Sequence, residues 1–183
     1  VSSFLLTVNW GLFVYAVQSG NAIQAALGYF IYPLVAVVLG ILLLREQLNW
    51  LGWMAVVFVA CGVITKIGLD GRPPLIGLFL AVTFGLYGVI RKKMGFDPIT
   101  GMFVETLIVM PLAAGYLLWM IYDGQPIFYG GGLVGILLAL LAGVITVFPL
   151  LLYHAGNLEL PFTMASLLFY ANPTMQLFLG IFV

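Results

Sequence analysis

The sequence predicts an all-α membrane protein with seven transmembrane helices, and its composition and segment lengths carry this prediction. Of the 183 residues, 64% are hydrophobic and 7% are charged, against roughly 25% charged residues in a soluble domain. The mean hydropathy of +1.21 is too high for the apolar surface to be hidden in a soluble core. Lipid is therefore the expected solvent of this chain.

Seven apolar segments alternate with short polar or Gly/Pro-rich connectors. Each segment approaches the ~20 residues that a helix needs to cross the hydrocarbon core. The expected spans are 1–17, 22–44, 50–67, 75–90, 98–122, 132–153 and 162–183. None of the connectors is long enough to hold a folded domain.

Asp97 followed by Pro98 predicts the start of the fifth helix. An aspartate at the N-cap accepts from free backbone N–H groups, and proline fits the first helical turn. Glu105 then lies roughly 10 Å along the helix axis, which makes it the only carboxylate at membrane depth.

The basic residues predict the orientation of the chain. Arg45, Arg91, Lys92 and Lys93 fall on one side of the membrane, whereas Lys66 and Arg72 fall on the other. By the positive-inside rule, the connector that carries Arg91–Lys93 is cytoplasmic.

Both ends of the sequence interrupt apolar runs. No charged segment precedes the first run, and the last residues, 177–183, are apolar without a polar flank. We therefore expect an internal piece of a longer protein.

An internal repeat is predicted at a spacing of 140 residues. This shift brings Ala25, Leu27, Pro33, Leu39, Gly40 and Ile41 onto Ala165, Leu167, Pro173, Leu179, Gly180 and Ile181. The two copies are five helices apart and must cross the membrane in opposite directions. Such inverted repeats characterise secondary transporters, in which one central site opens to either face in turn.

Pro33 and Pro173 are the predicted helix breaks of this repeat. A proline inside a helix frees a carbonyl one turn earlier, and such exposed backbone usually lines a cavity. A purely structural kink without ligand contact is the alternative.

Small residues recur at every fourth position in the fourth and sixth spans. The two stripes are Gly77, Ala81 and Gly85, and Gly131, Gly135, Ala139 and Gly143. They predict close helix packing, with homodimerisation through one stripe as the alternative.

Four stretches of the sequence resemble the EamA group of drug/metabolite transporters. They are LGYFIYPLVAVVLGILLLRE (27–46), NWGLFVYAV (9–17), YGVIRKK (87–93) and TGMFVET (100–106). More specifically, they resemble the RarD family, which is named for chloramphenicol sensitivity or resistance permeases. The final stretch FYANPTMQLFLGIFV departs from the family by stopping before its usual closing Gly-Glu.

The resemblance implies a bundle of about ten helices, formed by two inverted five-helix repeats around a central cavity. Residues 1–67 would be the end of the first repeat, 68–74 a connector and 75–183 the start of the second repeat. It also implies a multi-pass protein of the cell membrane that moves a small organic solute.

The candidate solute-binding residues are polar and aromatic side chains at membrane depth, where burial in lipid is costly. They are Asn9, Trp10, Tyr29, Tyr32, Tyr87, Glu105, Tyr170, Asn172 and Gln176. Tyr29 and Tyr32 share one helix face beside Pro33, and Asn172 and Gln176 share the repeat-related face beside Pro173. The alternative for Trp10 and the tyrosines is a role in the aromatic belts at the membrane surface.

Three roles are open for Glu105. It could carry a proton, pair with a cationic solute, or form a hydrogen bond to a neighbouring helix. An isolated carboxylate in a low dielectric favours its protonated form.

Charge and motif content restrict the function. No lysine or arginine lies in the middle of a span, which favours a neutral, zwitterionic or cationic solute with an apolar part over a dianionic one. A net charge of zero argues against a nucleic-acid partner. The sequence has one histidine, one cysteine and no G-x-S-x-G motif. We therefore expect no enzyme activity and no metal or cofactor site. The alternative function is a membrane scaffold or assembly subunit that does not transport.

Overall fold

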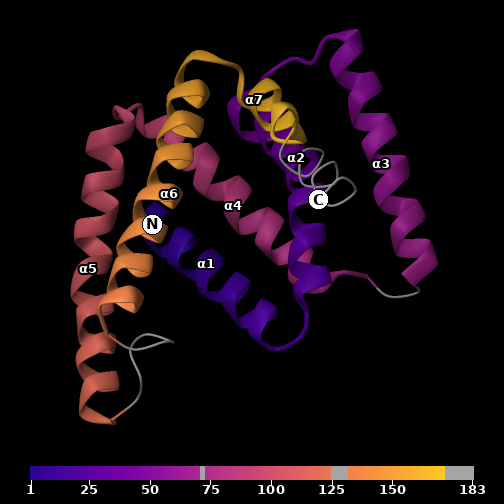
Figure 1. Ribbon diagram of the computed structural model, residues 1–183. Helices are drawn as coiled ribbons and strands as arrows, with labels where there is room; N and C mark the ends of the chain where they lie inside the picture. The colour runs from indigo at the N-terminus through magenta and orange to yellow at the C-terminus, as the bar shows by residue number, and fades with distance from the viewer. Residues whose placement is uncertain (71–72, 125–131, 172–183) are drawn as a thin grey trace. The chain divides into compact units, whose positions relative to one another are not determined.

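The computed structural model describes residues 1–70, 73–124 and 132–171, without the side chains of residues 66, 69 and 70. Within these ranges the secondary structure is entirely helical (Figure 1). The helices are α1 (Ser2–Gln18), α2 (Ala22–Leu44), α3 (Trp50–Asp70), α4 (Leu75–Met94), α5 (Pro98–Tyr122), α6 (Gly132–Glu159) and α7 (Phe162–Leu168). The prediction of an all-α chain is therefore confirmed for the described residues.

Among the described residues, four helices are long and apolar enough to cross a membrane, namely α2, α4, α5 and α6. The predicted bounds of α2 and α5 match those of the structure. The predicted ends of α4 and α6 are wrong, because α4 continues to Met94 and α6 to Glu159. Arg91, Lys92 and Lys93 form the last turn of α4, where positive charge compensates the negative end of the helix dipole.

Asp97 caps α5 as predicted. Its carboxylate accepts a hydrogen bond from the backbone N–H of Thr100 at 2.8 Å, and Pro98 occupies the first helical turn. This hydrogen bond from the Thr100 backbone lowers the pKa of Asp97 below its usual value. The cap therefore keeps its charge at neutral pH.

The chain forms two compact units. The first contains residues 1–95 and 157–183, and the second contains residues 96–156. The described part of the first unit includes α1 to α4 and α7, whereas the second holds α5 and most of α6. The two units are described separately below.

Glycine–glycine contact brings α2 and α4 close together. A Cβ atom on Gly77 would lie 2.7 Å from the carbonyl oxygen of Gln24 and 2.9 Å from the backbone nitrogen of Gly28. Farther along α4, a Cβ atom on Gly85 would lie 2.8 Å from the Leu39 side chain. The predicted packing role of the Gly77–Ala81–Gly85 stripe is confirmed, and Ala81 is itself buried. In the sixth span Gly135 is buried while Ala139 and Gly143 are exposed, and Gly131 lies outside the described residues.

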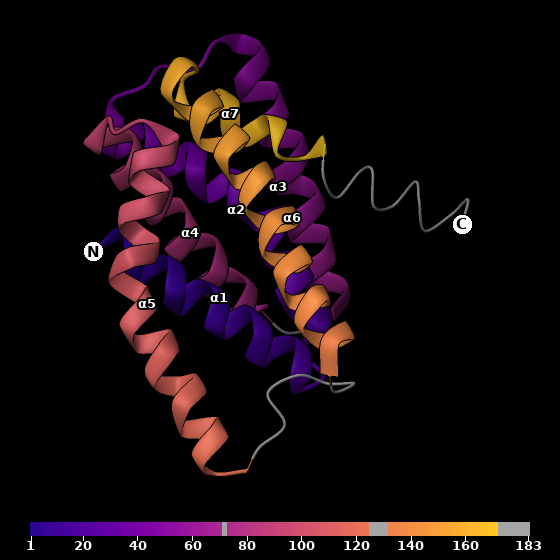
Figure 2. The ribbon, with the colours of Figure 1, turned by 60° about the vertical axis from the view of Figure 1, so that its left-hand side comes forward.

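Helix α7 runs antiparallel to α2. The start of α7 lies beside the end of α2, since a Cβ atom on Gly40 would meet the side chains of Thr163 and Phe162. Farther along α7, Ser166 meets Tyr32, and Tyr170, just beyond the helix, reaches Phe30. Figures 1 and 2 both show α7 beside the C-terminal half of α2.

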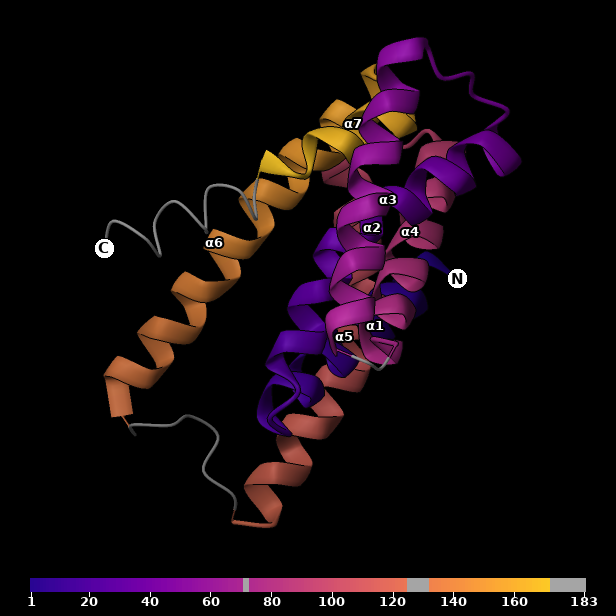
Figure 3. The ribbon, with the colours of Figure 1, turned by 90° about the vertical axis from the view of Figure 1, so that its right-hand side faces the viewer.

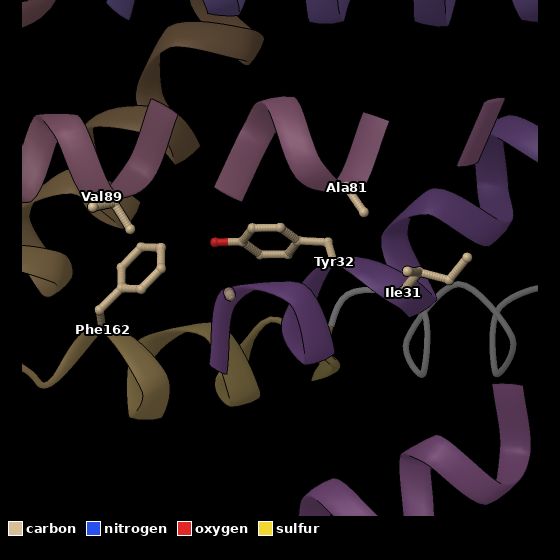
Figure 4. Packing of buried hydrophobic residues seen from close by; sticks show 6 residues of the cluster. Ile31, Tyr32, Ala81, Val89 and Phe162 are labelled. Atoms are coloured by element: carbon tan, nitrogen blue, oxygen red, sulfur yellow. The ribbon is translucent and has the colours of Figure 1, made fainter. Parts of the chain in front are cut away.

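The main core cluster fills the space between α2, α4 and α7. It contains Ile31, Tyr32, Ala36, Ala81, Val89 and Phe162. Figure 4 shows the Tyr32 ring beside α4, with its hydroxyl directed toward the side on which Phe162 and Val89 lie. A second cluster of Ala16, Ala25 and Leu80 joins α1 to α2 and α4, and Figure 3 shows these three helices together.

Gly77→Ala should destabilise the first unit by about 1–3 kcal/mol, because the added methyl group meets backbone atoms that cannot rotate away. The measurement is thermal unfolding of the detergent-solubilised protein. Gly62→Ala is the matched control, since a Cβ atom there meets nothing within 4 Å. Equal stability of the two variants would contradict the packing described for α2 and α4.

Candidate functional site

Seven aromatic rings of the first unit form a continuous series of contacts, here named the aromatic column. Its members are Trp10, Phe13, Tyr29, Phe169, Tyr32, Phe84 and Tyr87. Successive ring centroids are 4.9–6.4 Å apart, within the range of favourable aromatic pairing. The column joins α1, α2 and α4 to the residues that follow α7.

The column passes from accessible to buried rings. Trp10 and Tyr29 are 42% and 37% exposed, whereas Tyr32 and Tyr87 are 1% and 0% exposed. Phe169 joins the two parts, since its ring is stacked on Tyr29 and packs edge-on against Tyr32. A continuous series of aromatic contacts therefore runs from exposed rings of the unit into its core.

Hydroxyl groups lie beside the column in both its buried and its exposed part. The Tyr32 and Ser166 hydroxyl oxygens lie 3.5 Å apart, and Ser166 donates to the carbonyl oxygen of Phe162 at 2.6 Å. The Tyr170 hydroxyl donates to the carbonyl oxygen of Phe30 at 2.8 Å. A wall of rings with a few fixed polar groups is typical of small-molecule sites.

Residues that the predicted 140-residue repeat would pair with each other are in contact in this region. Tyr29 and Phe169 are 140 positions apart and their rings are stacked, with an angle of 19° between the planes. Phe30 and Tyr170 have the same spacing and share the hydrogen bond just described. Two repeats of opposite orientation are related by a two-fold axis, and residues near such an axis contact their equivalents in the other copy. The two contacts are therefore those that the predicted inverted repeat leads us to expect.

Pro33 lies buried inside α2, next to these contacts. It has no N–H group to donate to the carbonyl of Tyr29 one turn earlier. The neighbouring Phe30 carbonyl is the one that accepts from Tyr170. The helix α2 nevertheless continues through Pro33 to Leu44, so the structure shows no break at this position.

Asn9 connects α1 to α4. Its side-chain nitrogen donates to the carbonyl oxygen of Leu80 at 2.8 Å and contacts the Thr83 hydroxyl at 2.7 Å. Such interhelical hydrogen bonds are the polar contacts that hold helices together in a bilayer. These bonds support a positioning role for Asn9, beside the column that α1 helps to form.

The predicted site residues fall into three groups. The structure gathers Asn9, Trp10, Tyr29, Tyr32, Tyr87 and Tyr170 in the first unit. Glu105 is buried in α5, in the separately described second unit. Asn172, Pro173 and Gln176 lie outside the described residues, as does Arg72.

Sequence reasoning missed Phe13, Phe84, Phe169 and Ser166. The three phenylalanines carry no polar atom, so they could not be told from lipid-facing residues by type alone. Phe169 had one usable signal, because it is the 140-residue equivalent of Tyr29. Among the described residues, no group of three His, Cys, Asp or Glu side chains could hold a metal ion.

The long apolar helices and the internal polar contacts define a multi-pass helical membrane protein. Residues 1–66 match the model of the EamA-like transporter family. Over 183 residues the chain is 42% identical to the uncharacterized transporter YojE of Bacillus subtilis, covering 100% of this chain and 61% of that protein. Over 182 residues it is 37% identical to the protein RarD of Escherichia coli, covering 99% of this chain and 61% of that protein.

A more distant relative is the chloramphenicol-sensitive protein RarD of Pseudomonas aeruginosa. It is 29% identical over 185 residues, which cover 98% of this chain and 61% of that protein. The chain thus spans about three fifths of the length of the curated relatives it matches. No solved structure matches it. The chain is thus similar to the EamA-type transporters, and among them to RarD proteins.

Asn9→Ala should destabilise the first unit by about 0.6–1.7 kcal/mol, which are the average and the largest contribution of interhelical hydrogen bonds in a membrane protein. Thermal unfolding in detergent measures this loss. Gln18→Ala, at the exposed end of the same helix, should leave the stability unchanged. A loss that is equal in the two variants would show that the Asn9 bonds to α4 contribute nothing.

Proposed function

We propose that the full-length protein carries a small organic solute across the membrane by alternating access, with the aromatic column lining the solute path. The carrying observation is that the column lies where the antiparallel α2 and α7 bring repeat-related residues together. Two similar elements of opposite direction around one site allow that site to open to either face. Residues 1–67 and 75–183 would belong to the two repeats of a bundle of about ten helices.

The family supports this proposal. The matched family model is described as a transporter family, and the Bacillus subtilis relative is named a transporter. The proposal transfers only this general activity to the present chain.

The chemistry of the column indicates the class of solute. Stacked and edge-on rings favour a planar or apolar group, and the faces of Trp10 and the tyrosines attract a cation. The lysines and arginines of the sequence lie in connectors or near helix ends, such as the last turn of α4, and not in the middle of a span. We therefore propose a neutral, zwitterionic or cationic organic molecule with an aromatic or apolar part.

The cell membrane is the proposed location, with the Arg91–Lys93 end of α4 in the cytoplasm. This orientation rests on the basic last turn of α4.

The full-length protein, reconstituted in vesicles, should take up or release aromatic solutes from a panel of neutral and cationic compounds. Tyr32→Ala should lower transport by up to about tenfold, because an aromatic pair contributes about 0.5–1.5 kcal/mol beyond its area burial. Tyr122→Ala is the control, since Tyr122 is 93% exposed in α5. Both variants should insert into the membrane normally.

Two results would count against this proposal. If no compound of the panel crosses the vesicle membrane, the result favours the alternative function of a scaffold or assembly subunit. If Tyr32→Ala transports as fast as Tyr122→Ala, the protein transports by another path and the column is ordinary packing.

Glu105 is the proposed proton carrier of the transport cycle, because it is a carboxylate buried inside a transmembrane helix. Glu105→Gln should abolish the acceleration of transport by a pH gradient while preserving exchange of solute at equal pH. The measurement is flux with and without the imposed gradient. A response to the gradient equal to that of the parent protein would leave Glu105 with an interhelical structural role.

A further inference from the structure

The turn that joins α6 to α7, residues 157–163, presents two sets of backbone groups that need partners. The last carbonyl groups of α6 have no donors within their own helix, and the first N–H groups of α7 have no acceptors within theirs. Pro161 occupies the N-cap position of α7, and its side chain has no oxygen to accept from those N–H groups. Other parts of the chain must therefore satisfy this turn.

Glu46 caps α7 from the end of α2. Its two carboxylate oxygens accept from the backbone N–H groups of Phe162 at 2.6 Å and Thr163 at 2.8 Å. A negative charge at this point also opposes the positive end of the α7 dipole. A glutamate that lies 116 residues earlier in the chain thus replaces the missing local cap.

The end of α2 is shaped for this contact. Arg45 adopts a left-handed conformation with φ of 57°, and the Glu46 N–H donates back to the Gly40 carbonyl at 3.1 Å. Gly40 leaves room for Thr163, since a Cβ atom on Gly40 would lie 2.6 Å from the Thr163 methyl carbon. Together, Gly40 and Glu46 hold the first turn of α7.

Lys92 satisfies the other half of the turn. Its ammonium group donates to the carbonyl oxygen of Asn157 at 2.9 Å and to that of Leu160. It also lies 3.8 Å from a Glu46 carboxylate oxygen, and the Lys92 and Glu46 side chains are 20% and 14% exposed. A cation thus meets the carbonyl end of α6 while an anion meets the N–H end of α7.

The side-chain amide of Asn157, in the same turn, lacks hydrogen-bond partners within the described part of the chain. The Asn157 side chain is 2% exposed, and neither its amide nitrogen nor its amide oxygen has a hydrogen-bond partner in the described part of the chain. A buried, unpaired amide carries a free-energy cost that contact with water would remove. Burial of the Asn157 amide therefore lowers the stability of the closed turn.

The turn and α7 also pack beside Tyr32, in the buried part of the aromatic column. Phe162 is 0% exposed and belongs to the same core cluster as Tyr32. Ser166, one turn farther along α7, is 0% exposed and lies 3.5 Å from the Tyr32 hydroxyl. Moving the first turn of α7 away from α2 would uncover both side chains.

We propose that Glu46 and Lys92 form a latch that holds the turn of residues 157–163 against the ends of α2 and α4 and closes the solute path at this membrane face. This inference rests on the proposed transport function, to which it adds the residues that control access. Breaking the latch frees the first turn of α7 and opens the column to the side that carries Arg45 and Lys92.

The test uses the full-length protein in vesicles with Cys61→Ser, with any other native cysteine replaced, and with Ser166→Cys as the reporter. A charged thiol reagent that does not cross the membrane is added to each side in turn. Glu46→Gln or Lys92→Met should raise the labelling rate about tenfold or more from the latch side only, since the rate follows the open population. Lys93→Met is the matched control, because Lys93 is the exposed neighbour of Lys92.

A charge exchange separates this latch from a simple ion pair. In the double variant Glu46→Lys with Lys92→Glu the two charges still attract, but a lysine accepts no hydrogen bond from the N–H groups of α7. The exchange should therefore label as fast as the single variants. Slow labelling, as in the parent protein, would overturn the proposed role of the helix ends.

A cross-link distinguishes a latch from a permanent brace and also serves if the single variants fold poorly. Glu46→Cys with Thr163→Cys, joined by a short cleavable thiol reagent, should lose transport, and cleavage of the reagent should restore it. Unchanged transport in the cross-linked protein, or equal labelling of Lys93→Met and Lys92→Met, would overturn the latch. A labelling change without any transport by the parent protein would instead refute the proposed function and leave a moving turn.

Discussion

The close approach of α2 and α4 at Gly28 and Gly77 is the constraint on which the rest of the first unit depends. In lipid, helices gain no hydrophobic free energy by associating, so backbone contact and dispersion must hold them. At Gly77 the neighbouring backbone comes within 2.7 Å of where a side chain would begin. This contact sets the spacing at which Tyr32 of α2 meets Phe84 of α4, and it thereby fixes the centre of the aromatic column.

The ends of the helices pose the second physical problem, because a bilayer offers few partners for free backbone groups. At α5 the solution is local, since Asp97 caps its own helix. At the turn between α6 and α7 it is not local, since Glu46 and Lys92 come from other helices. Because the capping residues come from α2 and α4, the position of α7 depends on these two helices. The proposed latch requires such coupling between helices.

Local signals were sufficient to predict the helices but only part of the site. Hydropathy placed α2 and α5 at their observed bounds, and the Asp97–Pro98 pair placed the start of α5. Residue type led to the prediction of Tyr32 and Tyr87 as site residues, because a hydroxyl group at membrane depth needs a polar partner, and the structure places both rings in the column. It could not identify Phe84, whose function depends on which neighbour α4 packs against. Glu46 was likewise missed, since a glutamate in a connector is ordinary without knowledge of the α7 end that it meets.

The central claim is that the aromatic column binds the transported solute, and fluorescence of Trp10, at its accessible end, tests this most directly. In the full-length protein with Trp10 as its sole tryptophan, a transported solute should change the emission saturably, and Tyr32→Ala should weaken that response. A solute that is transported yet leaves the Trp10 emission unchanged at every concentration would contradict the account.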